Sequence, residues 1–181
     1  MVLNLNGESE GLKQRTFPGE TTASGRAIIV DPRRTMSVAA AEAAAGEENV
    51  LHLQIEPGTD IPLLNAIARV VLDRRWHDIA FIRQRSEWQT FEAYQRSSLG
   101  VDRPIAEFIA EAAVVTGVAE ADIYKAADWI AAPKKGGERK RTLFHYEKGL
   151  IWGLKNYENV AAIVDLALMT GNVGKPGTGC S

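Results

Sequence analysis

The pattern of apolar and polar positions in residues 26–60 predicts a strand, a helix and a second strand. Residues 27–30 form a short β-branched run that is typical of a buried strand, and residues 50–55 form another. Between them, the small residues 36–45 predict a helix that ends at Gly46. A strand–helix–strand unit of this length implies parallel strands joined by a right-handed crossover.

Polar residues follow both strands of this unit. The first strand leads into Asp31, Pro32 and Arg33, and the second leads into residues 57–60. Because open parallel sheets bind ligands at the carboxyl ends of their strands, we expect any site of this chain at that edge. A carboxylate at Asp31 suits a ribose diol or a guanine edge, although an Asp before a Pro is also a common turn residue.

Helical periodicity dominates the rest of the chain. Apolar residues at helical spacing predict four helices, at 60–73, 105–116, 120–131 and from Asn156 to the glycine at 171. Residues 142–146 predict a third strand. In residues 74–98 the pattern is weaker: Trp76, Ile79, Phe81 and Ile82 fit a short helix, and Phe91 and Tyr94 belong to another short piece. Side-chain oxygens of Thr35 or Ser37, and of Thr59 or Asp60, are expected to cap the first two helices.

This pattern divides the chain into three parts. Residues 1–25 predict a weak strand and a loop with a turn at Phe17–Glu20. Residues 26–170 predict one α/β domain, a Rossmann-like parallel sheet flanked by helices. Residues 171–181 form a glycine-dense loop. Since such loops usually lead into another element or line a ligand, we expect the chain to be truncated there.

Composition narrows the classes of function. The chain has 181 residues and a net charge of −2, so nothing in its charge favours nucleic acid or a membrane surface. The basic loop 134–141 is interpreted as solvated. No secretory signal or membrane-spanning run is visible. The single cysteine, Cys180, excludes a disulfide framework and any iron–sulfur or zinc site built from this chain's thiols alone.

No common catalytic or nucleotide motif is present. The sequence lacks the glycine fingerprint of dinucleotide binding, the P-loop, the nucleophile elbow and the zinc-binding His-Glu-x-x-His pattern. The residues therefore indicate a domain that binds a nucleotide-like ligand and carries no visible catalytic set or metal ligand. A non-catalytic nucleotide-binding module is one interpretation.

Several further residues suit parts of such a ligand. Gly58, Thr59 and Asp60 lie where a helix N-terminus offers free N–H groups to a phosphate or a nucleobase edge, or where they simply cap the helix. Lys148, beside Gly149, suits a phosphate or a salt bridge with the preceding glutamate. The Arg33–Arg34 pair suits phosphate or stacking on a base, or is simply solvated. Asn172 suits a pterin or purine edge, or a turn at a helix end.

Three motifs in order give the chain a family resemblance. They are Ile29–Arg33, Pro57–Asp60 followed by an apolar helix, and the late glycine-rich Thr170–Gly179. Together they resemble the molybdopterin oxidoreductases of the dimethyl sulfoxide reductase family. Within that family, Val30–Ala39 and Tyr146–Gly153 look like the large subunits of arsenite oxidases. Formate dehydrogenases and nitrate reductases are the alternative branches.

The resemblance implies a cofactor and its contacts. The domain would bind one guanine dinucleotide of a molybdenum bis(molybdopterin guanine dinucleotide) cofactor. Asp31 and Arg33 would line the guanosine end, and Asp60, with Gly58 and Thr59 beside it, would read the guanine. Lys148, Gly149 and Asn172 would lie near the cofactor.

The resemblance also implies partners that this chain does not itself contain. The cysteine motif that holds the family's iron–sulfur cluster is absent, and so is the Arg-x-Gly-Gly-His stretch near the oxyanion substrate. In a full-length enzyme, arsenite would be the substrate, electrons would leave through a Rieske-type small subunit, and the location would be periplasmic. No catalytic residue is expected within these 181 residues, and the chain alone is expected to be inactive.

Overall fold

The structure is a computed structural model that describes residues 2–5 and 25–181, with side chains from residue 25 onward. The turn expected at residues 17–20 lies outside this part. The described strands are β1 (Val2–Leu5), β2 (Arg26–Val30), β3 (Val50–Leu53), β4 (Thr142–His145) and β5 (Gly179–Cys180). The helices are α2 (Met36–Ala45), η1 (Glu47–Asn49), α3 (Asp60–Asp73), α4 (Ile79–Arg85), α5 (Trp88–Ser97), α6 (Ile105–Thr116), α7 (Glu120–Ala131), α8 (Lys148–Ile151) and α9 (Asn156–Met169).

The strands form one sheet in the order β3-β2-β1-β4-β5. The expected parallel pairing of β2 with β3 is confirmed, and β4 pairs in parallel with β5. β1 lies between β2 and β4 and runs antiparallel to both, so the other four strands share one direction. The antiparallel central strand was not predicted, because the period-2 pattern of a strand is the same in either direction.

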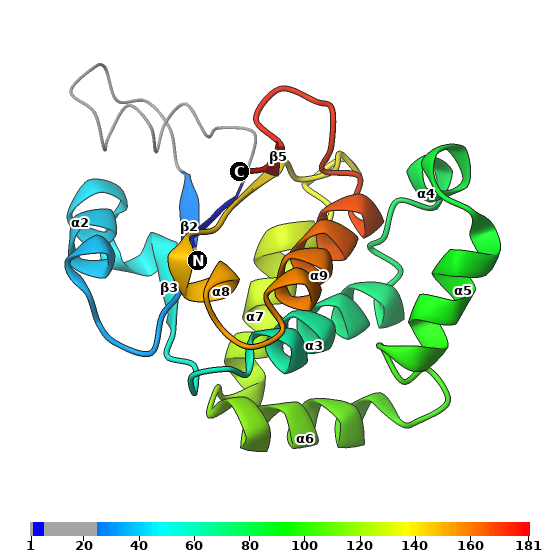
Figure 1. Cartoon of the computed structure of the whole chain (residues 1–181). Coiled ribbons are helices and arrows are strands. Elements are labelled where there is room, and N and C mark those ends of the chain that lie inside the picture. Colours follow the sequence, from blue (N-terminus) through cyan, green and yellow to red (C-terminus); the bar gives the residue numbers. More distant parts are fainter. Residues whose placement is uncertain (1, 6–24) are drawn as a thin grey trace.

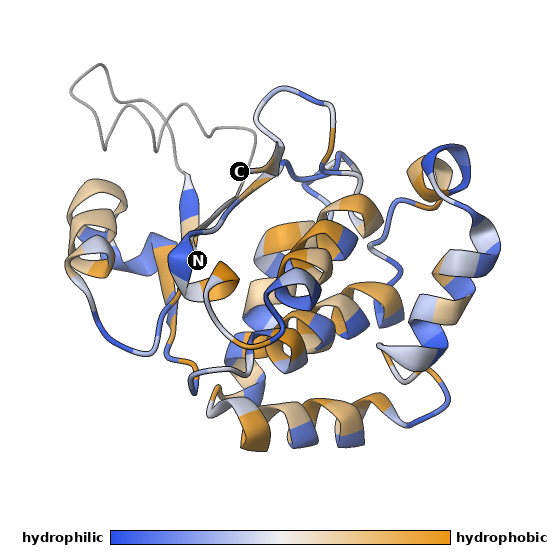
Figure 2. Ribbon diagram, in the orientation of Figure 1, coloured by the Kyte–Doolittle hydropathy of each residue, from blue (hydrophilic) through white to orange (hydrophobic). Residues whose placement is uncertain are grey.

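Helices cover both faces of this sheet unequally (Figure 1). The alternating side chains of β2 set the two faces. Ala27 and Ile29 pack with Val38 of α2 in a small cluster, whereas Ile28 and Val30 belong to the large core under α3, α7 and α9. Figure 2 shows the apolar stripes of α3, α7 and α9 gathered in this layer. The predicted α/β class is therefore confirmed.

The helix α3 lies at the centre of the large layer. Leu63, Leu64 and Ile67 on its inner face are fully buried. Arg69 on the same helix is also buried, and its guanidinium donates to the carbonyls of Leu99, Gly100 and Arg103. Arg69 thus fastens the connection between α5 and α6 to α3. Among the described residues, no helix has the length and apolar composition needed to cross a membrane.

The side-chain caps expected at the first two long helices are absent. Thr35 and Thr59 precede α2 and α3, but neither side chain makes a capping hydrogen bond. The hydroxyl of Thr59 instead donates to the carbonyl of Glu56, three residues earlier, at 2.7 Å. A side-chain cap does occur at α4, where Asp78 accepts from the N–H of Phe81 at 3.1 Å.

Candidate functional site

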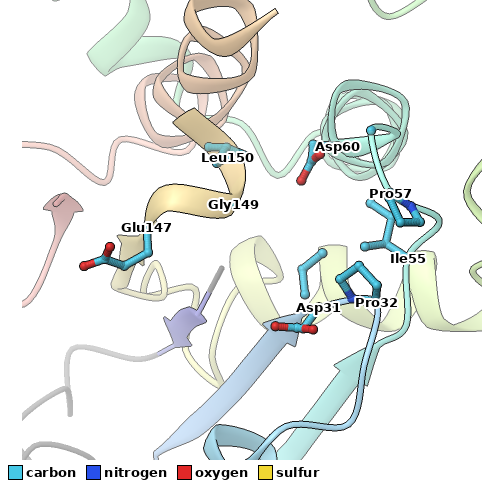
Figure 3. A pocket seen from close by; sticks show the side chains of 10 residues that line it. Asp31, Pro32, Ile55, Pro57, Asp60, Glu147, Gly149 and Leu150 are labelled. Carbon is cyan, nitrogen blue, oxygen red and sulfur yellow. The ribbon is translucent and has the colours of Figure 1, made fainter. Parts of the chain in front are cut away.

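A cavity of about 250 Å³ lies at the carboxyl ends of β2, β3 and β4, at the edge that the sequence predicts (Figure 3). Three short segments form it: the turn after β2, the loop from β3 into α3, and the start of α8. Its lining residues are Val30, Asp31, Pro32, Ile55, Pro57, Gly58, Asp60, Glu147, Gly149 and Leu150. Parallel strand direction therefore brings together residues that are more than a hundred positions apart in the sequence.

Asp31 is held in a fixed turn at the end of β2. Its backbone N–H donates to the carbonyl of Leu53, and its Oδ1 accepts from the N–H of Arg33 at 2.9 Å. The Nε2 of His52 lies 3.0 Å from the carbonyl oxygen of Asp31 and donates to it. These contacts confirm the turn interpretation of Asp31. Because they use Oδ1 alone, Oδ2 has no protein partner within residues 25–181 and remains available as an acceptor at the cavity.

Asp60 faces Asp31 across the cavity from the first turn of α3 (Figure 3). Its side chain is half-buried, and no ion pair joins it to any residue that the structure describes. Burial raises the pKa of the Asp60 carboxyl, while its own backbone N–H acts in the opposite direction. A partly desolvated carboxylate without a protein partner is a strong acceptor for N–H donors of a ligand.

Two glycines open the backbone toward the cavity. Gly58 has a φ of +84°, which few other residues adopt, and a Cβ added there would meet no atom within 4 Å. A Cβ at Gly149 would also meet no atom within 4 Å. Gly58 is therefore required by the turn itself, and both positions leave room for a ligand to approach the main chain.

The structure brings together Asp31, Gly58, Asp60 and Gly149 of the predicted site residues. The other four predicted residues are not among the lining residues of the cavity: Arg33, Thr59, Lys148 and Asn172. Arg33 is exposed, and the Lys148 ammonium stacks over the Trp152 ring at 5.0 Å. The Thr59 hydroxyl is engaged in the turn, and Asn172 is buried at the junction of α9 and β4.

Sequence reasoning missed Ile55 and Leu150, which supply apolar walls of the cavity. It placed Glu147 at this edge but not among the site residues. Glu147 is a third acid of the lining, although Figure 3 shows its side chain pointing away from Asp60. The signal for Glu147 was its position at a strand end. His52 is a supporting residue rather than a lining one. Its signal was a polar residue in an apolar strand, beside the predicted site.

The lining favours a ligand rich in hydrogen-bond donors. Carboxylates accept hydrogen bonds, and no Lys or Arg from residues 25–181 is among the lining residues, so the cavity suits a nucleobase amino–imino edge or ribose hydroxyls better than a phosphate. The volume is below the roughly 300–1,000 Å³ of pockets that enclose a whole small ligand, so one end of a larger ligand fits here. No cluster of three His, Cys, Asp or Glu residues within the described part of the chain is arranged to hold a metal ion.

Fold and cavity together define an α/β domain with an acidic site at the carboxyl ends of its parallel strands. The chain is 41% identical over 178 residues to the arsenite oxidase subunit AioA of Herminiimonas arsenicoxydans, covering 98% of this chain and 20% of that protein. It is 34% identical over 174 residues to the iodate reductase subunit IdrA of Denitromonas iodatirespirans, covering 83% and 19%. No family model matches the chain.

The chain belongs to the molybdopterin oxidoreductases of the dimethyl sulfoxide reductase family. It spans about a fifth of the length of the curated relatives that it matches. The fold agrees with this placement. Acetylene hydratase from Pelobacter acetylenicus superposes with a TM-score of 0.58 over 83% of this chain and 18% of that one, at 21% sequence identity.

Proposed function

We propose that this chain supplies the guanosine-binding end of a molybdopterin guanine dinucleotide site in a molybdenum oxidoreductase of the arsenite oxidase type. The observation that carries the proposal is the pair of carboxylates, Asp31 and Asp60, on opposite sides of one cavity at the expected strand edge. A molybdenum–pterin cofactor accords with the family of the chain. When bound, such a cofactor supplies the redox and oxygen-transfer chemistry, and the protein supplies binding and orientation.

Asp60 and Asp31 have separate parts in this proposal. The Asp60 carboxylate accepts the two adjacent N–H donors of the guanine edge, which match its two oxygens. The Asp31 carboxylate accepts from the ribose hydroxyls through Oδ2, since Oδ1 already holds the Arg33 N–H. Gly58 and Gly149 let the nucleoside lie against the main chain on either side.

The remaining predicted residues take more distant parts. Arg33 and Lys148 are exposed next to lining residues, so we assign them to the phosphates beyond the cavity mouth. Thr59 and Asn172 have engaged polar side chains. We therefore expect Thr59 to act through its backbone and Asn172 to act by shaping the glycine-rich loop that follows it.

Substrate, partner and location extend the proposal to the full-length enzyme. The support is the 41% identity to an arsenite oxidase subunit along nearly the whole chain. We propose arsenite as substrate, a Rieske-type small subunit and an iron–sulfur cluster as the electron path, and a periplasmic location. None of these involves a cavity residue, so the cavity is tested by itself.

The test is a titration of the 181-residue chain with guanosine, inosine and adenosine. Inosine lacks the exocyclic amino group, so it forfeits one hydrogen bond to the Asp60 carboxylate, and we expect it to bind about tenfold more weakly. Adenosine, which offers no amino–imino pair, is expected to bind more weakly still. Calorimetry or heteronuclear NMR gives the three dissociation constants.

Substitution at Asp60 tests whether its carboxylate causes the preference for guanosine. Asp60→Asn is expected to remove the preference for guanosine, whereas Asp73→Asn, an exposed acid at the other end of the same helix, keeps it. Equal affinity for all three nucleosides, or guanosine selectivity that survives Asp60→Asn, would overturn the proposal.

A further inference from the structure

The strands β2 and β3 separate at the strand-edge cavity. Their parallel pairing ends at Leu53, and one further main-chain bond follows, from the N–H of Asp31 to the carbonyl of Leu53 at 3.2 Å. In a continued parallel ladder, the N–H of Ile55 would donate next, to the carbonyl of Asp31. The described part of the chain contains no such bond. After β3 the chain turns instead toward α6, where the N–H of Glu56 donates to the carbonyl of Thr116 at 2.8 Å. This separation opens the cavity and leaves the Asp31 carbonyl without its main-chain donor.

The side chain of His52 supplies the missing donor. His52 is half-buried in β3, and its Nε2 lies 3.0 Å from the carbonyl oxygen of Asp31. Because a carbonyl oxygen can only accept, Nε2 carries the hydrogen and donates it. Both main-chain polar groups of Asp31 are therefore bonded to consecutive residues of β3, the carbonyl to His52 and the N–H to Leu53.

The turn that carries Asp31 has few other contacts that could hold it. Pro32 is exposed and has no N–H to donate. Arg34 forms an ion pair with Glu42, but its side chain is largely exposed, so this pair adds little. The orientation of the Asp31 carboxylate therefore depends mainly on the two bonds to β3 and on the bond within the turn that Oδ1 accepts.

We propose that His52 is a positioning residue for ribose recognition, because it holds the main chain of Asp31 where the two strands separate and keeps the carboxylate at the cavity. The inference rests on the proposed guanosine site, in which Oδ2 of Asp31 accepts from the ribose hydroxyls. A carboxylate that is already held in place loses little freedom on binding, so its hydrogen bonds contribute more to affinity. Without the His52 donor, the Asp31 carbonyl is free to turn toward water, and the carboxylate turns with it.

A positioning role differs from a general structural role in what it affects. His52 does not line the cavity, and Asp60, which is proposed to bind the guanine edge, belongs to α3 rather than to either strand. Loss of the His52 hydrogen bond should therefore weaken recognition of the ribose and leave the preference for guanosine over inosine unchanged. A residue that merely stabilises the fold would weaken binding of every nucleoside to the same extent.

The test compares guanosine with dideoxyguanosine, which keeps the guanine and lacks both hydroxyls of the ribose diol. The wild-type chain is expected to bind guanosine about tenfold or more tightly than dideoxyguanosine, because hydrogen bonds to a charged group are lost in the latter. His52→Met, which fills a similar volume without a donor, should reduce this preference severalfold. His52→Gln, whose amide offers an N–H at a similar reach, should restore it. Calorimetry on the 181-residue chain gives the dissociation constants.

A second measurement needs no ligand. The N–H of Arg33 donates to Oδ1 of Asp31, so its amide hydrogen exchange reports the order of the turn directly. Exchange is expected to be severalfold faster in His52→Met than in the wild type or in His52→Gln, whereas exchange in α3 stays unchanged and shows that the variants are folded. If the wild type binds no guanosine but exchange follows this order, the proposed function fails while the positioning of Asp31 by His52 is supported.

Three results would overturn the inference. The first is an undiminished preference for guanosine over dideoxyguanosine in His52→Met, and the second is an equal loss of affinity for both nucleosides. The third is a failure of His52→Gln to restore what His52→Met loses, which would assign the effect to packing of the ring rather than to its N–H donor.

Discussion

Asp60 carries a carboxylate whose burial lowers the stability of the fold at neutral pH. Burial raises the pKa of its carboxyl, so ionisation is less favourable in the folded chain than in the unfolded one. Below its ordinary pKa of about 4, the group is protonated in both states and has no effect on stability. Between that value and the raised pKa of the folded state, the Asp60 carboxyl is protonated more often in the folded chain than in the unfolded one. The free energy of unfolding therefore falls as the pH rises through this range.

Asp60→Asn is therefore expected to be at least as stable as the wild type at neutral pH. The gain is small, because the charge at a helix N-terminus contributes roughly 0.3–1 kcal/mol in the opposite direction. The difference should disappear in acid. Denaturant unfolding across the pH range measures it. A variant that is less stable than the wild type at neutral pH but equal in acid would show that the carboxylate stabilises the fold.

The positions of single residues could be predicted where the strand topology alone determines them. Asp31 and Asp60 follow strands whose periodicity is plain, so their placement at one edge needed only the parallel topology. The side-chain direction of Lys148 was not predicted. Its ammonium lies over Trp152, four residues later, which is a helical neighbour that the sequence displays. Thr59 shows the opposite case, since only the turn geometry reveals that Glu56 competes for its hydroxyl.

At the scale of elements, Asn172 joins the end of α9 to the start of β4. Its Oδ1 accepts from the N–H of Thr142 at 2.9 Å, and its Nδ2 donates to Thr170 Oγ1 at 2.8 Å. The Thr170 hydroxyl in turn donates to the carbonyl of Leu166 in α9. With only 1% of Asn172 exposed, this buried network fixes where the glycine-rich loop begins.

Asn172→Ala is expected to destabilise the chain by about 2 kcal/mol, because the buried N–H of Thr142 loses its acceptor. Asn65→Ala is the matched control. Asn65 is a half-buried helical residue with no recorded hydrogen bond from its side chain among the described residues, so its replacement leaves stability unchanged or slightly raised. Thermal unfolding compares the two. If Asn172→Ala keeps wild-type stability, the amide has no structural role and a direct cofactor contact becomes the better account.

The elements that resisted prediction are those that depend on distant partners. The helix α4 is preceded by Asp78, which caps it and also pairs with Arg139 at 3.3 Å and Lys175 at 3.8 Å. These partners lie 61 and 97 positions later in the sequence. Because local periodicity carries no trace of such pairs, residues 74–98 predicted only a short helix around residues 76–82, without its bounds, whereas α3 and α9 were evident from their apolar stripes.

For the whole molecule, the arrangement of the sheet explains why the acidic cavity lies at one edge. Four strands of common direction align their carboxyl ends, and three of them line the acidic cavity. That cavity is sized for one end of a dinucleotide, and no metal-holding cluster occurs among the described residues. The relatives are about five times longer than this chain, so their activity is a property of much more polypeptide.

The isolated 181-residue chain is accordingly expected to bind guanosine but not to oxidise arsenite. Among the described residues, the lining of its cavity contains no cationic side chain and no metal-holding cluster. The measurement is arsenate production with an artificial electron acceptor, beside the guanosine titration on the same sample, with Asp60→Asn as the matched control. Arsenate formation above the background of a chain-free reaction, abolished by Asp60→Asn, would place the active centre within these residues. Guanosine binding without turnover is what a cofactor-holding segment should show, because orientation alone moves no electrons.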